Sequence, residues 1–132
     1  MTAAGKNVAP AQTEDALRQH PLVSQAMLLG DKQPFVAALI TLDPEALPGW
    51  LTARGLPAMT VPEAAAHETL LAEIGSAVAT ANSLVSKAEQ VKKWTVLTTD
   101  FTIDGGELTP TLKVKRNVVM DKYADDVAAI YN

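Results

Sequence analysis

Apolar residues follow two patterns along the chain, short continuous runs and a spacing typical of one helix face. The continuous runs cover residues 22–30, 35–42 and 94–101, and their content of Leu, Val, Ile and Trp predicts three β-strands. The segment "GDKQP" (30–34) joins the first two runs, and its Gly, Asp and Pro are typical of a hairpin connection. The pattern therefore predicts a strand pair early in the chain and a third strand late in it.

Helix signals occur at residues 10–20, 44–54, 62–86 and 117–131. The first of these segments ends at His20, because a residue that precedes proline is pushed out of the helical region. The second begins after Asp43 as an N-cap with proline in the first turn, and Gly55 marks its end. These signals predict helices before and after the strand pair.

The segment 62–86 has the clearest helical periodicity. Thr60 and Glu63 in front of it have the spacing of a capping box. Apolar residues then recur every three or four positions, which is typical of a helix that packs one face into a core; they are Leu70, Ile74, Ala77, Ala81 and Leu84. The fold class that these elements predict is α+β, a small, mostly antiparallel three-stranded sheet with packed helices and a basic loop.

Composition adds limits to this prediction. A chain of 132 residues is the size of one domain, and 48% apolar but only 5% aromatic residues indicate a core of Leu, Val, Ile and Ala. The chain has no cysteine, and His20 and His67 show no ligand spacing, so we expect no metal site and interpret both histidines as ordinary polar residues. No apolar run is long enough to cross a bilayer and no signal peptide is recognisable, which favours a cytoplasmic protein.

Charge singles out one region of the chain. The net charge of −4 argues against general nucleic-acid binding. Residues 1–81 carry four Lys or Arg against eight Asp or Glu, whereas residues 82–132 carry seven of each. The late positive charge lies around residues 92–93 and 113–116, and we expect any anion-binding site there.

The sequence "GGELTPTLKVKRNVV" (105–119) combines several residue types that suit an anion. Gly105 and Gly106 permit unusual backbone conformations, Thr109 and Thr111 supply hydroxyls, and Lys113 follows. Lys115 and Arg116 add two further cations, so that a phosphate would be a suitable ligand. A solvated basic hairpin that leads into a helix explains the same residues equally well. No phosphate-binding glycine loop of the Walker type and no hydrolase or metalloprotease motif is present.

The segment "DFTIDGGELTPTLKVKRNVV" closely resembles the lysine loop of long-chain fatty-acid–CoA ligases, which belong to the adenylate-forming superfamily. The segments "TAAGKNVAPAQTEDALRQHPLVSQAMLLGDKQPFVAALITLD" and "EQVKKWTVL" are also similar to that family, so the resemblance covers essentially the whole chain. Much of the superfamily has Pro-Lys-Thr-x-Ser-Gly-Lys in this loop. The form "TPTLK" is similar to the long-chain branch and implies a fatty acyl substrate.

The resemblance implies a single C-terminal lid domain over residues 1–132, with a large N-terminal adenylation domain as its partner outside this chain. It places the catalytic lysine at Lys113, with Lys115 as the nearest rival. Gly105, Gly106, Thr109, Thr111 and Arg116 would support that loop, and Gly5, Lys6 and Asn7 would line the path of coenzyme A. ATP with Mg²⁺, bound mainly by the large domain, and coenzyme A are the implied co-substrates. The isolated domain is expected to be inactive, and acetylation of Lys113 would remove its charge.

Two other classes of function explain the residues without the resemblance. A freestanding module could bind a nucleotide or a partner protein through the basic loop and catalyse nothing. A purely structural interaction domain would tolerate replacement of Lys113. The ligase interpretation predicts a cytoplasmic enzyme, which in its complete form could bind a membrane peripherally, and it predicts neither a nucleic-acid partner nor a transmembrane segment.

Overall fold

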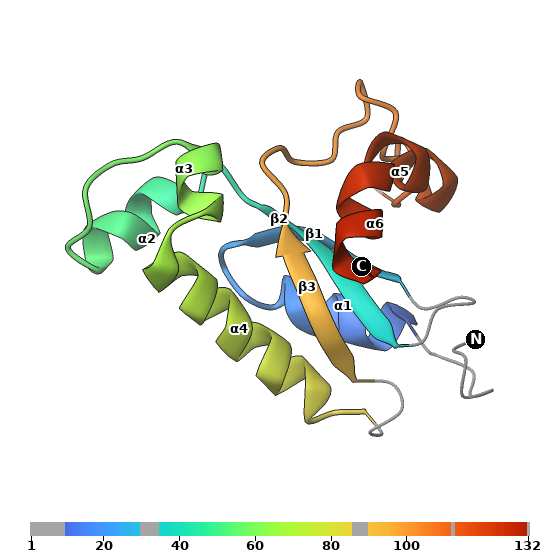
Figure 1. The fold of residues 1–132 in the computed structure, drawn as a ribbon. Helices are drawn as coiled ribbons and strands as arrows, with labels where there is room; N and C mark the ends of the chain where they lie inside the picture. Colours follow the sequence, from blue (N-terminus) through green and yellow to red (C-terminus); the bar gives the residue numbers. More distant parts are fainter. Residues whose placement is uncertain (1–9, 30–34, 86–89, 112, 132) are drawn as a thin grey trace. The chain divides into compact units, whose positions relative to one another are not determined.

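A three-stranded sheet organises the first of two compact units in the computed structural model, which describes residues 10–29, 35–85, 90–111 and 113–131. The first unit covers Met1–Asp100 and the second covers Phe101–Asn132. In the first unit the order along the chain is helix, two strands, three helices and a third strand (Figure 1). The predicted α+β class and the three-stranded sheet are confirmed.

The sheet has the strand order β1-β2-β3 and is mixed rather than mostly antiparallel as predicted. Strand β1 (Val23–Leu29) pairs antiparallel with β2 (Val36–Leu42), as the two apolar runs predict. Strand β3 (Val91–Val96) pairs parallel with β2 on its other side. The parallel pairing follows from the long connection between β2 and β3, because a crossover through helices returns the chain to the same end of the sheet.

The third strand does not have the predicted bounds of 94–101. It begins earlier because the side chain of Asn82 pairs with the backbone of Val91, with N–O distances of 2.8 and 3.0 Å. The ladder ends where the amide of Leu97 donates to the carbonyl of Ile40 at 2.8 Å. Beyond that point Asp100 accepts hydrogen bonds from the hydroxyls of Ser24 (2.7 Å) and Thr41 (2.8 Å). The residues after Leu97, which were predicted to belong to the strand, are therefore held by side-chain contacts of Asp100 instead of backbone pairing.

The first two helices are α1 (Pro10–Arg18) and α2 (Leu47–Ala53), both shorter than predicted. Helix α2 begins later than Asp43, since the carboxylate of Asp43 binds the amide of Glu45 in a preceding turn. Gly55 lies beyond the end of α2 with a φ of +70°, a conformation that favours glycine, so the predicted stop signal is confirmed.

The predicted helix 62–86 is two helices, α3 (Val61–Ala65) and α4 (Glu68–Asn82). The capping box of Thr60 and Glu63 is confirmed at the start of α3. The interruption lies at His67, which has an extended backbone and accepts a hydrogen bond from the amide of Thr69 through its ring nitrogen Nδ1 at 3.2 Å. His67 is therefore the N-cap of α4 rather than an interior helix residue.

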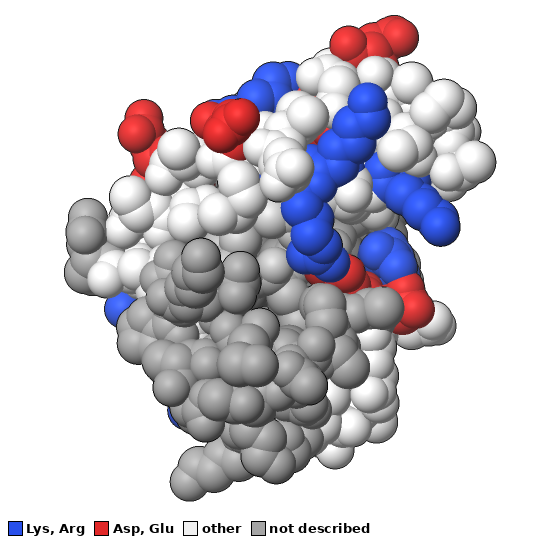
Figure 2. Space-filling view, turned by 90° about the vertical axis from the view of Figure 1, so that its right-hand side faces the viewer, with Lys and Arg blue, Asp and Glu red and all other residues white. Residues whose placement is uncertain are grey.

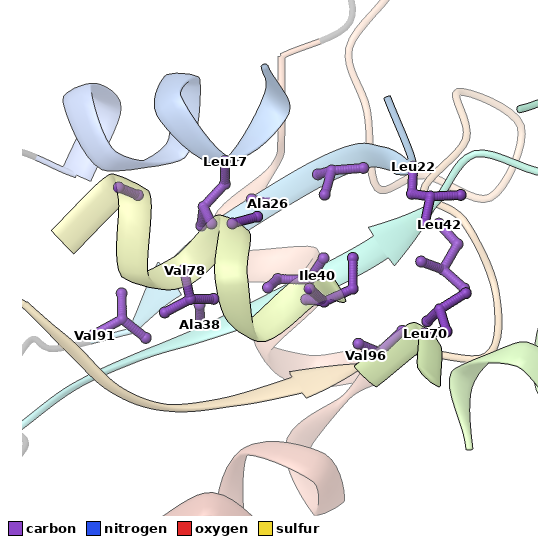
Figure 3. Packing of buried hydrophobic residues seen from close by; sticks show 14 of the residues in the cluster. Leu17, Leu22, Ala26, Ala38, Ile40, Leu42, Leu70, Val78, Val91 and Val96 are labelled. Atoms are coloured by element: carbon purple, nitrogen blue, oxygen red, sulfur yellow. The ribbon is translucent and has the colours of Figure 1, made fainter. Parts of the chain in front are cut away.

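Helices α1 and α4 pack together and contribute to one hydrophobic core with the sheet (Figure 3). Leu17 of α1 lies beside Ala26 of β1, and Val78 of α4 lies beside Ala38 of the central strand. Of the predicted helical stripe, Leu70, Ile74, Ala77 and Ala81 are buried, whereas Leu84 is 57% exposed. Leu84 is exposed because α4 ends at Asn82, so the helical periodicity no longer directs it into the core.

The second unit contains the basic loop and two helices, α5 (Arg116–Lys122) and α6 (Ala124–Tyr131). The predicted single helix 117–131 is wrong, because Tyr123 leaves the helical region with φ −111° and ψ 28°. The ring of Tyr123 lies 5.9 Å from the ring of Phe101, measured between centroids. In the part of the chain that the structure describes, no helix is long and apolar enough to span a bilayer.

Candidate functional site

Residues 107–115, hereafter the lysine hairpin, form two short arms in which backbone groups pair across the loop. Leu108 and Val114 form an antiparallel bridge. The amide of Lys115 donates to the carbonyl of Glu107 at 2.7 Å, and the amide of Thr109 donates to the carbonyl of Lys113 at 2.8 Å. The basic segment is thus a hydrogen-bonded hairpin at the start of α5.

Thr109 holds the backbone of Lys113 from two directions. Its amide binds the Lys113 carbonyl, and its hydroxyl accepts a hydrogen bond from the Lys113 amide at 3.1 Å. The hydroxyls of Thr109 and Thr111 lie 2.9 Å apart and share a hydrogen bond. Both threonines therefore have local roles in shaping the hairpin.

The cations of this segment lie at the surface. Lys113, Lys115 and Arg116 are all exposed, and Arg116 is the first residue of α5. Among the residues that the structure describes, the ammonium of Lys113 has no ion pair or side-chain hydrogen bond. On the face drawn in Figure 2, Lys and Arg side chains lie near Asp and Glu side chains, so the charge there is of mixed sign. Lys113 and Lys115 are therefore exposed cations of the hairpin.

Gly105 and Gly106 form a turn directly before the hairpin. The amide of Gly105 donates to the hydroxyl of Thr102 at 2.8 Å, and the amide of Gly106 donates to the carbonyl of Ile103 at 3.1 Å. Gly106 has a φ of +88°, which disfavours any side chain. A Cβ atom on Gly105 would lie 2.6 and 2.7 Å from the two carboxylate oxygens of Glu107. The turn requires glycine at both positions, for different reasons.

Glu107 is a residue of this region that the sequence analysis did not single out. It is only 2% exposed, and its Oε1 accepts a hydrogen bond from the amide of Thr102 at 3.1 Å. Its Oε2 pairs with the ammonium of Lys122 from α5, which also donates to the carbonyl of Gly105 at 2.9 Å. The only sequence signal for this role is an acidic residue directly after the glycine pair and before an apolar residue.

Electrostatics favour the ionised form of the pair between buried Glu107 and half-exposed Lys122. Burial by itself would raise the pKa of Glu107, but the hydrogen bonds from Lys122 and Thr102 and the charge of Lys122 lower it below the ordinary value. The hydrogen bond to Glu107 raises the pKa of Lys122 above its ordinary value. Because the glutamate pKa is lowered, the stabilisation by this pair is present at neutral pH and is lost as the pH falls through the folded-state pKa.

Both histidines have structural contacts. The Nδ1 atom of His20 accepts a hydrogen bond from the amide of Leu22 at 3.1 Å, and its Nε2 lies 2.6 Å from a carboxylate oxygen of Glu73. The other Glu73 oxygen binds Arg54 at 2.8 Å. His67 caps α4. These contacts match the interpretation of both residues as ordinary polar groups, and the described residues contain no cluster of three metal-ligating side chains.

The predicted site residues fall into two groups, and the structure describes only one of them. Gly5, Lys6 and Asn7 lie outside the described residues. The others fall in one continuous stretch of the second unit. Gly105 and Gly106 shape the turn, Thr109, Thr111 and Lys113 belong to the lysine hairpin, and Arg116 follows it at the start of α5.

The α+β architecture with its three-stranded mixed sheet matches the C-terminal domain of adenylate-forming enzymes. The chain belongs to the family of AMP-binding enzyme C-terminal domains, whose family model matches residues 1–132. It is 55% identical over 133 residues to the long-chain-fatty-acid–CoA ligase FadD15 of Mycobacterium tuberculosis, covering 100% of this chain and 22% of the ligase. It is 40% identical over 149 residues to a long-chain-fatty-acid–CoA ligase of Gallus gallus, covering 99% of this chain and 20% of that protein.

The chain therefore spans about a fifth of the length of the curated relatives that it matches. Among solved structures, the adenylation domain of a carboxylate reductase from Mycobacterium chelonae matches 98% of this chain and 19% of its own, with a TM-score of 0.74 and 22% identity. The A-PCP didomain of a carboxylic acid reductase from Segniliparus rugosus, in complex with AMP, has a TM-score of 0.73 and 23% identity, over 98% of this chain and 17% of its own. At that level of identity, these structures support the fold alone.

Proposed function

We propose that this chain is the C-terminal lid domain of a long-chain fatty-acid–CoA ligase and supplies the lysine for acyl-adenylate formation. The observation that carries the proposal is the 55% identity to a long-chain-fatty-acid–CoA ligase across the whole chain, lysine hairpin included. The "ELTPTLKVKR" segment, which resembles the long-chain branch, supports a fatty acyl substrate. The rest of the ligase, with its fatty-acid site, belongs to the large domain.

The proposed reaction has two steps. In the first, a carboxylate oxygen of the fatty acid attacks the α-phosphorus of ATP, which forms the acyl-adenylate and releases pyrophosphate. In the second, the coenzyme A sulfur attacks the acyl carbonyl carbon, and AMP leaves with the electrons of the broken C–O bond. Lys113 acts in the first step, where its ammonium offsets negative charge on both reacting anions and holds them together. This role needs no proton transfer.

The contacts of the lysine hairpin suit this role. The backbone of Lys113 is held by Thr109 on both its N–H and C=O sides, while the side chain extends from the surface. An anchored backbone with an exposed ammonium can place a positive charge at a defined point of a neighbouring domain. In this proposal Gly105, Gly106, Thr109 and Thr111 shape the hairpin, and Arg116 steadies its junction with α5 rather than binding substrate.

The second step follows a rotation of the lid, in which Lys113 withdraws. Gly5, Lys6 and Asn7 then line the path of the coenzyme A pantetheine, where glycine allows close approach of the backbone. These three residues enter the proposal through the family resemblance alone. Mg²⁺ would accompany the ATP phosphates. The described residues offer no cluster of carboxylates for it, so we assign it to the large domain and derive no step through it. We place the complete enzyme in the cytoplasm.

The test is the complete ligase with Lys113→Ala, with the two half-reactions measured separately. Pyrophosphate exchange reports adenylation, and transfer from synthetic acyl-adenylate to coenzyme A reports the second step. Loss of one such electrostatic group lowers the rate on the order of 10²–10³, and we expect that loss in the first step only. Lys115→Ala is the matched control, because Lys115 is an exposed lysine of the same hairpin. Full adenylation by Lys113→Ala would overturn the assignment, and loss in Lys115→Ala alone would transfer the role to Lys115.

A further inference from the structure

We propose that the ion pair between buried Glu107 and half-exposed Lys122 is a positioning device that fixes where the lysine hairpin presents Lys113. The inference rests on the proposed role of Lys113 in adenylation and adds two residues to it. Neither residue touches substrate in this proposal. Both act through the backbone of the hairpin, at the step in which Lys113 must meet a carboxylate and a phosphate.

The Glu107 carboxylate depends on the charge of Lys122. The Glu107 side chain is 3% exposed, and Lys122 is the cation paired with it. A buried carboxylate without its cation is strongly unfavourable, so removal of the Lys122 ammonium, which is itself 46% exposed, forces Glu107 to move or to lose its charge. Lys122 also binds the carbonyl of Gly105, which ties helix α5 to the glycine turn. The pair therefore determines the shape of residues 102–107.

Backbone hydrogen bonds connect the Glu107–Lys122 pair to Lys113. Glu107 is the first residue of the hairpin, and its own carbonyl accepts the hydrogen bond from the amide of Lys115. The Leu108–Val114 bridge and the Thr109–Lys113 bond follow directly along the two arms. A shift of Glu107 is thus transmitted to Lys113 through the two backbone hydrogen bonds that make up the Leu108–Val114 bridge. A misplacement of about 1 Å at a catalytic group is enough to lower a rate about 100-fold.

Lys122 and Lys113 differ in the contacts that their ammonium groups make. The ammonium of Lys122 is used by the Glu107 carboxylate and the Gly105 carbonyl. The ammonium of Lys113 makes no such contact with the described residues, and the side chain is exposed. Lys122 is therefore a positioning residue, whereas Lys113 keeps its charge for an anion brought to the hairpin.

The experiment uses the complete ligase with Lys122→Met and Lys122→Arg, and both half-reactions are measured. Lys122→Met should lower kcat of adenylation about 100-fold and leave the transfer to coenzyme A within a few-fold of the wild type, because Lys113 does not act in that transfer. Lys122→Arg keeps the cation and should restore most of the adenylation rate. Glu107→Gln should resemble Lys122→Met, and the double variant should be no slower than the slower single variant, since both changes break one contact.

Arg18→Met is the matched control, because it removes the cation of a surface ion pair, with Asp15, in the first unit. Both half-reactions should be unchanged in it. Amide hydrogen exchange provides a second readout. In Lys122→Met the amides of Lys113 and Lys115 should exchange faster, while the amide of Tyr123, which is bonded within α5, keeps its protection. Unfolding of the unit would expose all three amides.

The outcomes separate this inference from the proposed function. If Lys113→Ala retains adenylation in the same assay, the proposed role of Lys113 fails, whatever the Lys122 variants do. If Lys113→Ala loses adenylation and Lys122→Met does not, the proposed function stands and the positioning role is overturned. Loss of both half-reactions together with the Tyr123 protection would also overturn it, because the pair would then serve folding only.

Discussion

Gly105 and Glu107 lie so close together that the identity of one limits the other. A Cβ on Gly105 would approach both Glu107 oxygens and also the Thr102 hydroxyl within 2.7 Å. The Glu107 carboxylate cannot easily move away, because it is buried and bound on both oxygens. A single methyl group at this position therefore acts on the ion pair as well as on the turn.

We expect Gly105→Ala to destabilise the second unit by about 1–3 kcal/mol, the usual cost of forcing an extra methyl group into a packed site. Gly49→Ala is the control, because the residue belongs to helix α2 and, outside its chain neighbours and the helix backbone, no atom of the described residues lies within 4 Å of the added Cβ. It should stabilise the first unit by up to about 1 kcal/mol through helix propensity. Urea unfolding followed by the NMR signals of Tyr123 and Trp50 measures the two units separately. Equal stability of the Gly105 variant and the wild type would contradict the packing argument.

At the scale of elements, the apolar residues predicted to form one stripe on helix α4 are not all buried. The predicted stripe places Ile74 and Leu84 on the same helix face. Ile74 is fully buried in the core, whereas Leu84 follows the end of α4 and is more than half exposed. The same apolar spacing therefore contributes to the free energy of folding at Ile74 and adds little to it at Leu84.

Ile74→Ala should lower the free energy of unfolding by about 2–5 kcal/mol, because it removes buried methyl groups and leaves a cavity. Leu84→Ala should change it by less than about 0.5 kcal/mol, as expected for an exposed position. Urea denaturation of both variants, followed by the fluorescence of Trp50 and Trp94 in the first unit, measures the difference. A similar loss in both variants would mean that Leu84 contributes to a core that the structure does not assign to it.

At the scale of the whole molecule, the chain holds the lysine hairpin but spans about a fifth of its ligase relatives. If Lys113 acts by entering a site on another domain, the 132-residue chain supplies the lysine and that other domain supplies the substrate pocket. We expect the purified chain to release no pyrophosphate from ATP and palmitate, and to form no acyl-CoA from acyl-adenylate. Pyrophosphate release in that assay would contradict the lid interpretation. Titration with ATP, AMP and coenzyme A adds a separate test, because tight binding by the chain alone would favour the freestanding module.

The candidate site was predictable in part. The glycine pair, the two threonines and Lys113 are close in sequence, and their types already suggest a shaped loop that carries a cation. Glu107 and Lys122 were not predictable as a pair, because the glutamate lies in the loop, the lysine lies on a helix, and neither position has a distinctive pattern. The break at Tyr123 was missed for a similar reason, since the apolar and polar residues of 117–131 are compatible with one continuous helix.

The sequence by itself determined the features that depend on neighbours within a few residues. These include the first two strands, the capping box at Thr60 and the stop at Gly55, because backbone preference and side-chain periodicity are local. Only the tertiary structure decided which groups distant in the chain meet. It set the parallel pairing of β3 with β2, the start of β3 at Val91 through Asn82, and the burial of Glu107 against Lys122. Such pairings depend on how the elements pack, and a buried charge or a strand partner is defined only once that packing exists.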